Sequence, residues 1–165
     1  YIDLVLLHEP IDYIQNWKLL EEYYETKGKN KIRYIGVSNF NIKHLENINH
    51  KNIYSNQIEL NPYLIRDNLE NYCKNNNIKI IAHTPLAKGE KLNDKNLINL
   101  GKKYNRNPSD MMLQWNLNKN NLIIPRSKNF KHILENLKCE INLDIDDFNY
   151  MNTFNCNYST HPKYL

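Results

Sequence analysis

Ser55-Asn56-Gln57-Ile58-Glu59-Leu60-Asn61-Pro62-Tyr63 places polar side chains at the end of a short apolar run, and this pattern decides the fold. Two other runs end in the same way: Ile35-Gly36-Val37-Ser38-Asn39-Phe40 before it and Ile124-Pro125-Arg126-Ser127 after it. Strands of a (β/α) barrel deliver side chains to the active-site mouth at their C-terminal ends. The three runs therefore predict strands that end at one functional edge.

Short apolar runs alternate with amphipathic stretches along the chain. The runs predict five strands, at residues 4–7, 34–37, 54–58, 78–82 and 122–124. Apolar residues three or four apart predict helices at 14–24, 42–48, 67–75, 96–104, 108–117, 130–137 and 143–154. Gly28 is predicted to end the first helix. Met111, Met112 and Trp115 have helical spacing and are predicted to pack in the core. Strands that are each followed by helix indicate repeated βα units in one α/β domain.

The three motifs, together with the opening Tyr1-Ile2-Asp3-Leu4-Val5-Leu6-Leu7-His8-Glu9-Pro10, resemble the aldo-keto reductases. This family consists of nicotinamide-dependent oxidoreductases built on a (β/α)₈ TIM-type barrel. A complete barrel usually takes about 250 residues, whereas this chain has 165. The opening run resembles the family's fourth strand. The resemblance therefore implies that residues 1–165 are the C-terminal part of such a domain, an incomplete barrel with about five βα units.

Composition and charge limit the classes of protein to which this chain could belong. The sequence is 41% hydrophobic and 24% charged, which is ordinary for a globular domain with a core. Its net charge of +4 comes from lysines spread among acidic residues, which favours a solvated basic surface over a nucleic-acid groove. We expect neither a secretory leader nor a membrane span. The three cysteines, Cys73, Cys139 and Cys156, are widely spaced, so we expect no disulfide framework and no zinc site, and a cytoplasmic location.

His8 is the candidate catalytic residue. It directly follows an apolar run and so should lie at the C-terminal end of a strand. The resemblance implies that it orients the substrate carbonyl and assists a tyrosine acid. That tyrosine, a lysine and an aspartate come from the family's first three strands, to which this chain has no counterpart. The family often has a bulky aromatic after the histidine, where this chain has Glu9. The alternative is a structural histidine at a strand end.

The resemblance assigns the nicotinamide end of the cofactor to residues at three strand ends. Ser38, Asn39 and Gln57 match the family residues that hold the carboxamide, and amide side chains offer both a donor and an acceptor for it. His83 replaces the ring, most often tyrosine, that stacks on the nicotinamide, and it is alternatively polar lining of the pocket. The remaining candidates follow the same strand: Thr84, Leu86 and, for the pyrophosphate, Lys88.

The adenosine end is assigned to residues after the last strand. Arg126 and Ser127 match residues that hold the 2′-phosphate of NADP, and a guanidinium fits phosphate geometry. They precede a predicted helix, whose first N–H groups are free to bind an anion. His132 stands where the family often has an arginine, and Glu135 and Asn136 match the residues that hold the adenine. Arg126 is alternatively a surface cation.

The resemblance implies an NADP(H)-dependent oxidoreductase that reduces aldehydes or ketones to alcohols by hydride transfer, without a metal. Its expected partner is a small-molecule carbonyl substrate, with no nucleic acid and no membrane. The isolated fragment is expected to be inactive. The alternative from another class is a non-catalytic, NADP-binding barrel that serves as a regulatory or structural subunit. An intact Asp, Tyr and Lys upstream would distinguish the enzyme from that subunit.

Overall fold

The computed structural model describes residues 1–164, and these group into two compact units. Unit 1 comprises Tyr1–Ile58, Asp67–Ile81 and the chain end from Lys163, and unit 2 comprises Glu59–Arg66 and Ala82–Pro162. The chain passes between the units several times, so neither unit is a simple half of the sequence. The single domain expected from the sequence stays a prediction. No helix among the described residues has the length and apolar character needed to cross a bilayer.

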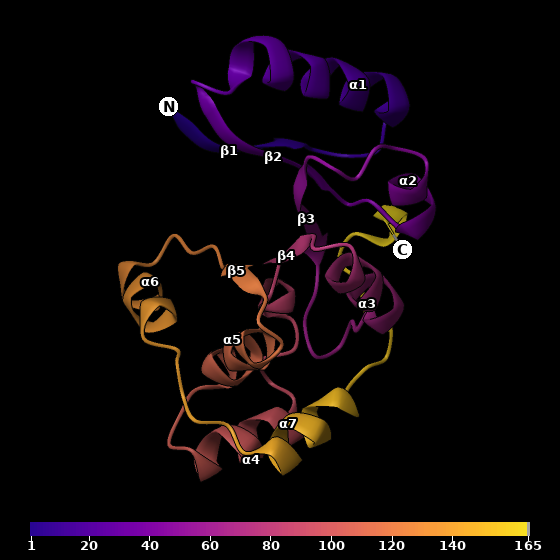
Figure 1. Ribbon diagram of the computed structural model, residues 1–165. Helices are drawn as coiled ribbons and strands as arrows, with labels where there is room; N and C mark the ends of the chain where they lie inside the picture. The colour runs from indigo at the N-terminus through magenta and orange to yellow at the C-terminus, as the bar shows by residue number, and fades with distance from the viewer. Residues whose placement is uncertain (165) are drawn as a thin grey trace. The chain divides into compact units, whose positions relative to one another are not determined.

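The strands form one sheet in the order of the sequence, β1-β2-β3-β4-β5 (Figure 1). Their bounds are β1 Ile2–Leu7, β2 Ile32–Ser38, β3 Ile53–Glu59, β4 Lys79–His83 and β5 Leu122–Ile124. β1 pairs with β2, and β2 with β3, both in parallel. Sequential parallel strands joined by helices are what repeated βα units produce. The five predicted strands are thus confirmed, and most extend one or two residues beyond the apolar runs.

Unit 1 contains three α-helices: α1 Tyr13–Tyr23, α2 Ile42–Glu46 and α3 Asp67–Asn75. α1 lies along β1 in Figure 1 and buries Trp17. Cys73 of α3 is fully buried, as predicted for a core thiol, and burial raises the pKa of this thiol to about 12.

The first helical segment ends at Gly28, as predicted, but its last turn is π-helical. The α-helix stops at Tyr23 and continues as a π-helical turn, Tyr24–Gly28. Gly28 does not take the left-handed conformation of a helix-capping glycine, because Gly89 is the one described glycine with positive φ. A Cβ on Gly28 would lie 3.2 Å from the Tyr23 carbonyl oxygen, so close approach explains this glycine.

Gly36 of β2 lets two strands approach closely. A Cβ here would lie 2.6 Å from the Ser55 carbonyl oxygen and 2.9 Å from Cδ2 of Leu6. We expect Gly36→Ala to lower the free energy of unfolding by about 1–3 kcal/mol, because the crowded backbone of β3 must shift. Urea denaturation measures this loss, with exposed Lys43→Ala as the control. Equal stability of the two variants would contradict the packing assigned to Gly36.

Unit 2 is built around α5 Pro108–Asn118, which contacts β5 and the helices α4 Lys95–Lys103, α6 Phe130–Leu137 and α7 Ile145–Asn152. Met111, Met112 and Trp115 are fully buried, so the prediction of core packing is confirmed. The Trp115 indole donates a hydrogen bond to Asn152 of α7 at 2.8 Å. α6 differs from α5 because it buries none of its residues.

Candidate functional site

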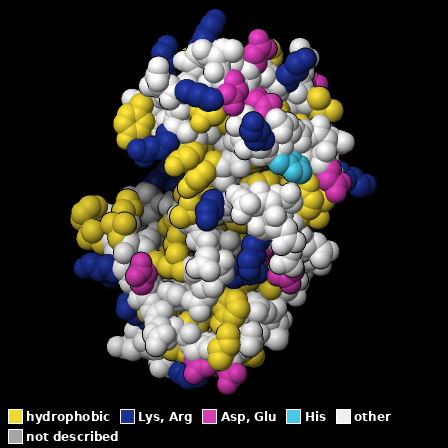
Figure 2. Space-filling model, in the orientation of Figure 1, with side chains coloured by type: hydrophobic (Ala, Val, Ile, Leu, Met, Phe, Trp, Pro, Cys, Tyr) yellow, Lys and Arg dark blue, Asp and Glu magenta, His cyan; other side chains and the backbone are white. Residues whose placement is uncertain are grey.

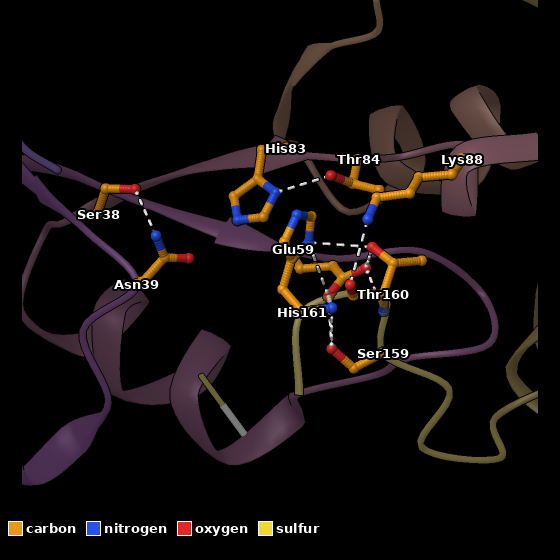
Figure 3. Close-up of polar contacts among 9 residues, drawn as sticks. All are labelled: Ser38, Asn39, Glu59, His83, Thr84, Lys88, Ser159, Thr160 and His161. Carbon is orange, nitrogen blue, oxygen red and sulfur yellow. Dashed lines mark hydrogen bonds and ion pairs between the residues drawn. The ribbon is translucent and has the colours of Figure 1, made fainter. Parts of the chain in front are cut away.

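Unit 1 brings four of the candidate residues together at the ends of β1, β2 and β3. The Ser38 hydroxyl and the Asn39 backbone N–H both donate to the Gln57 carbonyl oxygen, at 3.0 and 2.8 Å. The Asn39 amide donates to the Ser38 hydroxyl at 3.2 Å, drawn in Figure 3, and to the His8 carbonyl oxygen at 3.1 Å. The chain segments that carry His8, Ser38, Asn39 and Gln57 are therefore fixed to one another.

The local backbone explains why Asn39 follows Ser38. Asn39 has a φ of 64°, a left-handed conformation that asparagine adopts more readily than most residues. Both side chains are buried, and both make the hydrogen bonds that burial demands. Their contacts show that these two polar residues turn the chain at the end of β2, a structural role that is compatible with ligand binding.

His8 and Glu9 differ in their surroundings. His8 is exposed. The Glu9 carboxylate accepts hydrogen bonds from the Lys163 ammonium at 2.8 Å and the Tyr164 hydroxyl at 2.7 Å. The bond from Lys163 chiefly holds the pKa of Glu9 below its ordinary value. Glu9 is therefore ionised at neutral pH and accepts hydrogen bonds instead of donating a proton.

In unit 2, β4 ends in a strained loop. His83 Nδ1 lies 3.0 Å from the Thr84 hydroxyl (Figure 3). Three non-glycine residues of the loop have positive φ: Thr84 at 52°, Ala87 at 46° and Lys88 at 53°. Such conformations cost free energy, and they cluster at ligand sites in proteins. The strain makes this loop a candidate ligand-binding segment on grounds independent of the resemblance.

The same loop forms one wall of a cavity of about 780 Å³. The start of α5 and the β5–α6 connection line it as well. Seven candidate residues meet there: Leu86, Lys88, Arg126, Ser127, His132, Glu135 and Asn136. The sequence did not indicate the further lining by Lys131 of α6 and by Pro108 and Ser109 of α5. His83 and Thr84 are not among the lining residues.

Two features make the cavity suitable for an anion. Arg126, Lys88 and Lys131 bring positive charge to it, and Glu135, 3.8 Å from Lys131, is the one acidic residue in its lining. α6 begins beside Arg126 and Ser127. The Ser127 hydroxyl accepts from the Asn129 N–H at 3.0 Å, and the Asn129 side chain accepts from the Lys131 N–H. The connection before α6 is thus ordered by its own hydrogen bonds.

The sequence did not indicate a further polar cluster around Glu59, in unit 2. This carboxylate is 1% exposed and accepts four hydrogen bonds from the C-terminal tail. Its donors are the Ser159 hydroxyl at 2.6 Å, the Thr160 hydroxyl at 2.6 Å and N–H at 3.0 Å, and the His161 N–H at 3.2 Å (Figure 3). Burial alone would raise the pKa of Glu59, but these donors outweigh it and leave the pKa below 4.5. The tail lacks periodicity, so no pattern predicted its partner.

Acid is expected to release this tail. The pKa of Glu59 in the folded chain lies below its ordinary value of 4.5. The carboxylate therefore stabilises the fold fully above that value, and the stabilisation is lost as pH falls through the folded-state pKa. Hydrogen exchange of the Thr160 and His161 amides between pH 6 and pH 3 measures the release. Glu59→Gln should remove the pH step, and an identical step in that variant would assign it to another group.

Comparisons with known proteins agree on one family. The profile of the aldo/keto reductase family matches residues 1–155. An uncharacterized oxidoreductase of Schizosaccharomyces pombe is 38% identical over 141 residues, which cover 82% of this chain and 50% of that protein. The glyoxal reductase of Bacillus subtilis is 35% identical, covering 90% of this chain and 52% of its own length. An aldo-keto reductase solved in complex with NADPH superposes with a TM-score of 0.86 at 26% identity, covering 97% of this chain and 56% of its own.

These matches define an α/β protein of the (β/α)₈ barrel type, as the sequence predicted. The chain belongs to the aldo/keto reductase family. It spans about half the length of the curated relatives that it matches.

The net positive charge was expected to form a solvated surface and not a nucleic-acid groove. On the face drawn in Figure 2, Lys and Arg side chains are scattered among Asp and Glu side chains. The expected absence of nucleic-acid binding stays a prediction, as does the cytoplasmic location. Within residues 1–164, no group of three or more His, Cys, Asp or Glu side chains could hold a metal ion.

Proposed function

We propose that the chain is part of an NADP(H)-dependent oxidoreductase that reduces small aldehydes or ketones to alcohols. One observation carries the proposal: seven of the residues that the resemblance assigns to the cofactor, six of them to its pyrophosphate and adenosine end, line one cavity in unit 2. Two of them come from the loop after β4, and the others come from the β5–α6 connection and α6, about 40 residues further along the sequence. Their meeting supports a shared ligand over unrelated surface roles.

The donor set of the cavity fits NADP. Arg126 would bind the 2′-phosphate with its planar guanidinium, assisted by the Ser127 hydroxyl and by His132. The free N–H groups at the start of α6 add to the attraction for an anion. Glu135 and Asn136 would bind the adenine, and Lys88 with Leu86 the pyrophosphate side. When bound, NADPH supplies the hydride that reduces the carbonyl.

The residues of unit 1 and of the β4 end would act on the reacting groups. Ser38, Asn39 and Gln57 would orient the carboxamide, while the His83 ring, held by Thr84, would face the nicotinamide. His8 would donate a hydrogen bond to the substrate carbonyl. This bond stabilises the negative charge that develops on oxygen during hydride transfer.

Cofactor binding tests the proposal directly. We expect the chain to bind NADPH, measured as a change in the fluorescence of the reduced nicotinamide on titration. 2′-phosphoadenosine compounds should displace it, because they fill the adenosine end alone. Binding of neither NADPH nor NADH would contradict the proposed function.

Gln57 is expected to affect turnover more than binding. In a protein that carries the complete catalytic set, Gln57→Ala removes a contact that orients the nicotinamide ring, and a misplacement of about 1 Å can cost about 10²-fold in rate. The affinity for NADPH should change far less, because the adenosine end remains. Single-turnover kinetics and a separate binding titration distinguish the two effects. An unchanged turnover number would contradict the role.

The non-catalytic alternative keeps one specific observation in its favour. Two groups near the strand ends, the Glu9 carboxyl and the Tyr63 hydroxyl, are poorly suited to donate a proton: Glu9 is ionised, and burial raises the pKa of Tyr63 far above its ordinary value. A protein whose other strands also lack an acid would bind NADP without reducing a carbonyl. The activity of the complete protein with an aldehyde separates the two functions.

A further inference from the structure

The tail from Asn155 to His161 follows a path that is fixed at several points within unit 2. The N–H groups of Cys156 and Tyr158 both donate to the Tyr63 carbonyl oxygen, and the Asn155 side chain accepts from the Ile65 N–H. The Lys88 ammonium donates to the Thr160 carbonyl oxygen at 3.2 Å. These contacts bring the tail across the β4 loop to Glu59.

Glu59 makes more hydrogen bonds to the tail than any of the residues just described. It is a buried carboxylate, and a buried charge is tolerated only where hydrogen bonds or opposite charges compensate it. Ser159, Thr160 and His161 supply all four of the hydrogen bonds described for it. The His161 Nδ1 lies a further 3.6 Å from its Oε2. The carboxylate thus fixes three consecutive tail residues at once.

This attachment places one imidazole against another. The His161 and His83 rings lie 5.6 Å apart between centroids with an interplanar angle of 82°, an edge-to-face contact (Figure 3). On its other side, His83 Nδ1 lies 3.0 Å from the Thr84 hydroxyl. Rotation of the His83 ring is therefore opposed both by a hydrogen-bonding partner and by a packed ring.

We infer that Glu59 is a positioning residue: it docks Ser159–His161 so that the His161 imidazole packs edge-on against His83 and fixes the orientation of that ring. The inference rests on the proposed function, in which His83 faces the nicotinamide. A ring held in place before the cofactor arrives loses little freedom on binding, so preorganisation strengthens the stack. A tail that only covered the core would stabilise the fold without affecting His83.

The first experiment observes His83 without any cofactor. The side-chain nitrogens of the six histidines are recorded by NMR on ¹⁵N-labelled chain, with His83→Asn and His161→Ala assigning the two signals. Glu59→Gln should shift the ring signals of both His161 and His83. The matched control is Glu90→Gln, which neutralises another carboxylate that accepts a hydrogen bond from the tail, in this case from the Tyr158 hydroxyl. This control should leave the His83 signals unchanged.

The second experiment measures NADPH affinity. His161→Ala is expected to weaken NADPH binding about 2- to 10-fold, the range given by loss of one aromatic contact. His161→Phe keeps a ring at the edge of His83 and should restore most of the affinity, although it has no ring nitrogen to lie beside the Glu59 carboxylate. A role confined to stability would not distinguish alanine from phenylalanine in this way when both variants are folded.

The outcomes distinguish a failure of the positioning role of Glu59 from a failure of the proposed NADP-dependent function. Unchanged His83 signals in both Glu59→Gln and His161→Ala would overturn the positioning role. If the wild-type chain does not bind NADPH, the proposed function fails, while the NMR result still decides whether Glu59 positions the His83 ring. Should Glu59→Gln not fold, His161→Ala and His161→Phe supply the same decision.

Discussion

The 165-residue chain is expected to bind NADPH and yet to reduce a broad aldehyde substrate no faster than background. General acid catalysis typically contributes about 10²–10⁴-fold to a rate, and the resemblance implies that the family's tyrosine, lysine and aspartate have no counterpart in this sequence. Two further groups near the strand ends are poorly suited to replace them. Hydrogen bonds from Lys163 and Tyr164 keep the pKa of Glu9 low, and burial raises the pKa of Tyr63, which makes it a weaker proton donor.

Exposed apolar surface is a second reason to expect low reductase activity from the 165-residue chain. Phe130 and Leu137 of α6 are 72% and 76% exposed, and Leu122 of β5 is 51% exposed. Exposed apolar surface next to a strand edge favours association between chains. NADPH oxidation and light scattering should be measured on the same sample. Robust turnover by a monodisperse monomer would contradict the expectation and would point to a proton donor within the chain.

Replacement of Arg126 is expected to remove the preference for NADPH over NADH. The guanidinium lines the cavity and would make charge-assisted hydrogen bonds to the 2′-phosphate. A hydrogen bond to a charged group contributes about 1.5–3 kcal/mol, so Arg126→Ala should weaken NADPH binding by about 10- to 100-fold. NADH has no phosphate at this position, so its affinity should stay nearly the same.

The control for Arg126 is Lys128→Ala. Lys128 is an exposed cation two residues further along and is not among the residues that line the cavity. Its loss lowers the net charge by the same amount, so it accounts for long-range attraction of the phosphate. A fall in NADPH affinity that is equal for both variants, or a retained preference in Arg126→Ala, would assign the phosphate to another residue.

Most of the fold could be predicted from the sequence, because its helices and strands have strong local patterns of apolar residues. The apolar run at 122–124 and the helical spacing at 67–75 and 130–137 predicted β5, α3 and α6 with their observed bounds. The first helical segment ends at Gly28 as predicted, but the π-helical form of its last turn was not predicted, because it depends on local crowding around Gly28 and Tyr23 instead of on periodicity.

The candidate site could be predicted from the sequence only in part. Strand-end motifs indicated Ser38, Asn39 and Gln57, and the structure joins them by hydrogen bonds, although their part in binding stays a prediction. Glu59 stood in the most informative stretch of the sequence and still had no predicted role. Its partners lie in a tail without periodicity, and a contact between distant segments leaves no local pattern.

The attachment of the tail to Glu59 also determines when the fold can be completed during synthesis. Glu59 and Thr160 are 101 residues apart, so Glu59 is synthesised well before its partners in the tail. Until those residues leave the ribosome, a nascent chain must keep the Glu59 carboxylate hydrated or protonated, so the interior around it stays open to water. A message truncated before the codons of Ser159–His161 would yield a protein fixed in that open state, with the strand end around Glu59 accessible to proteases.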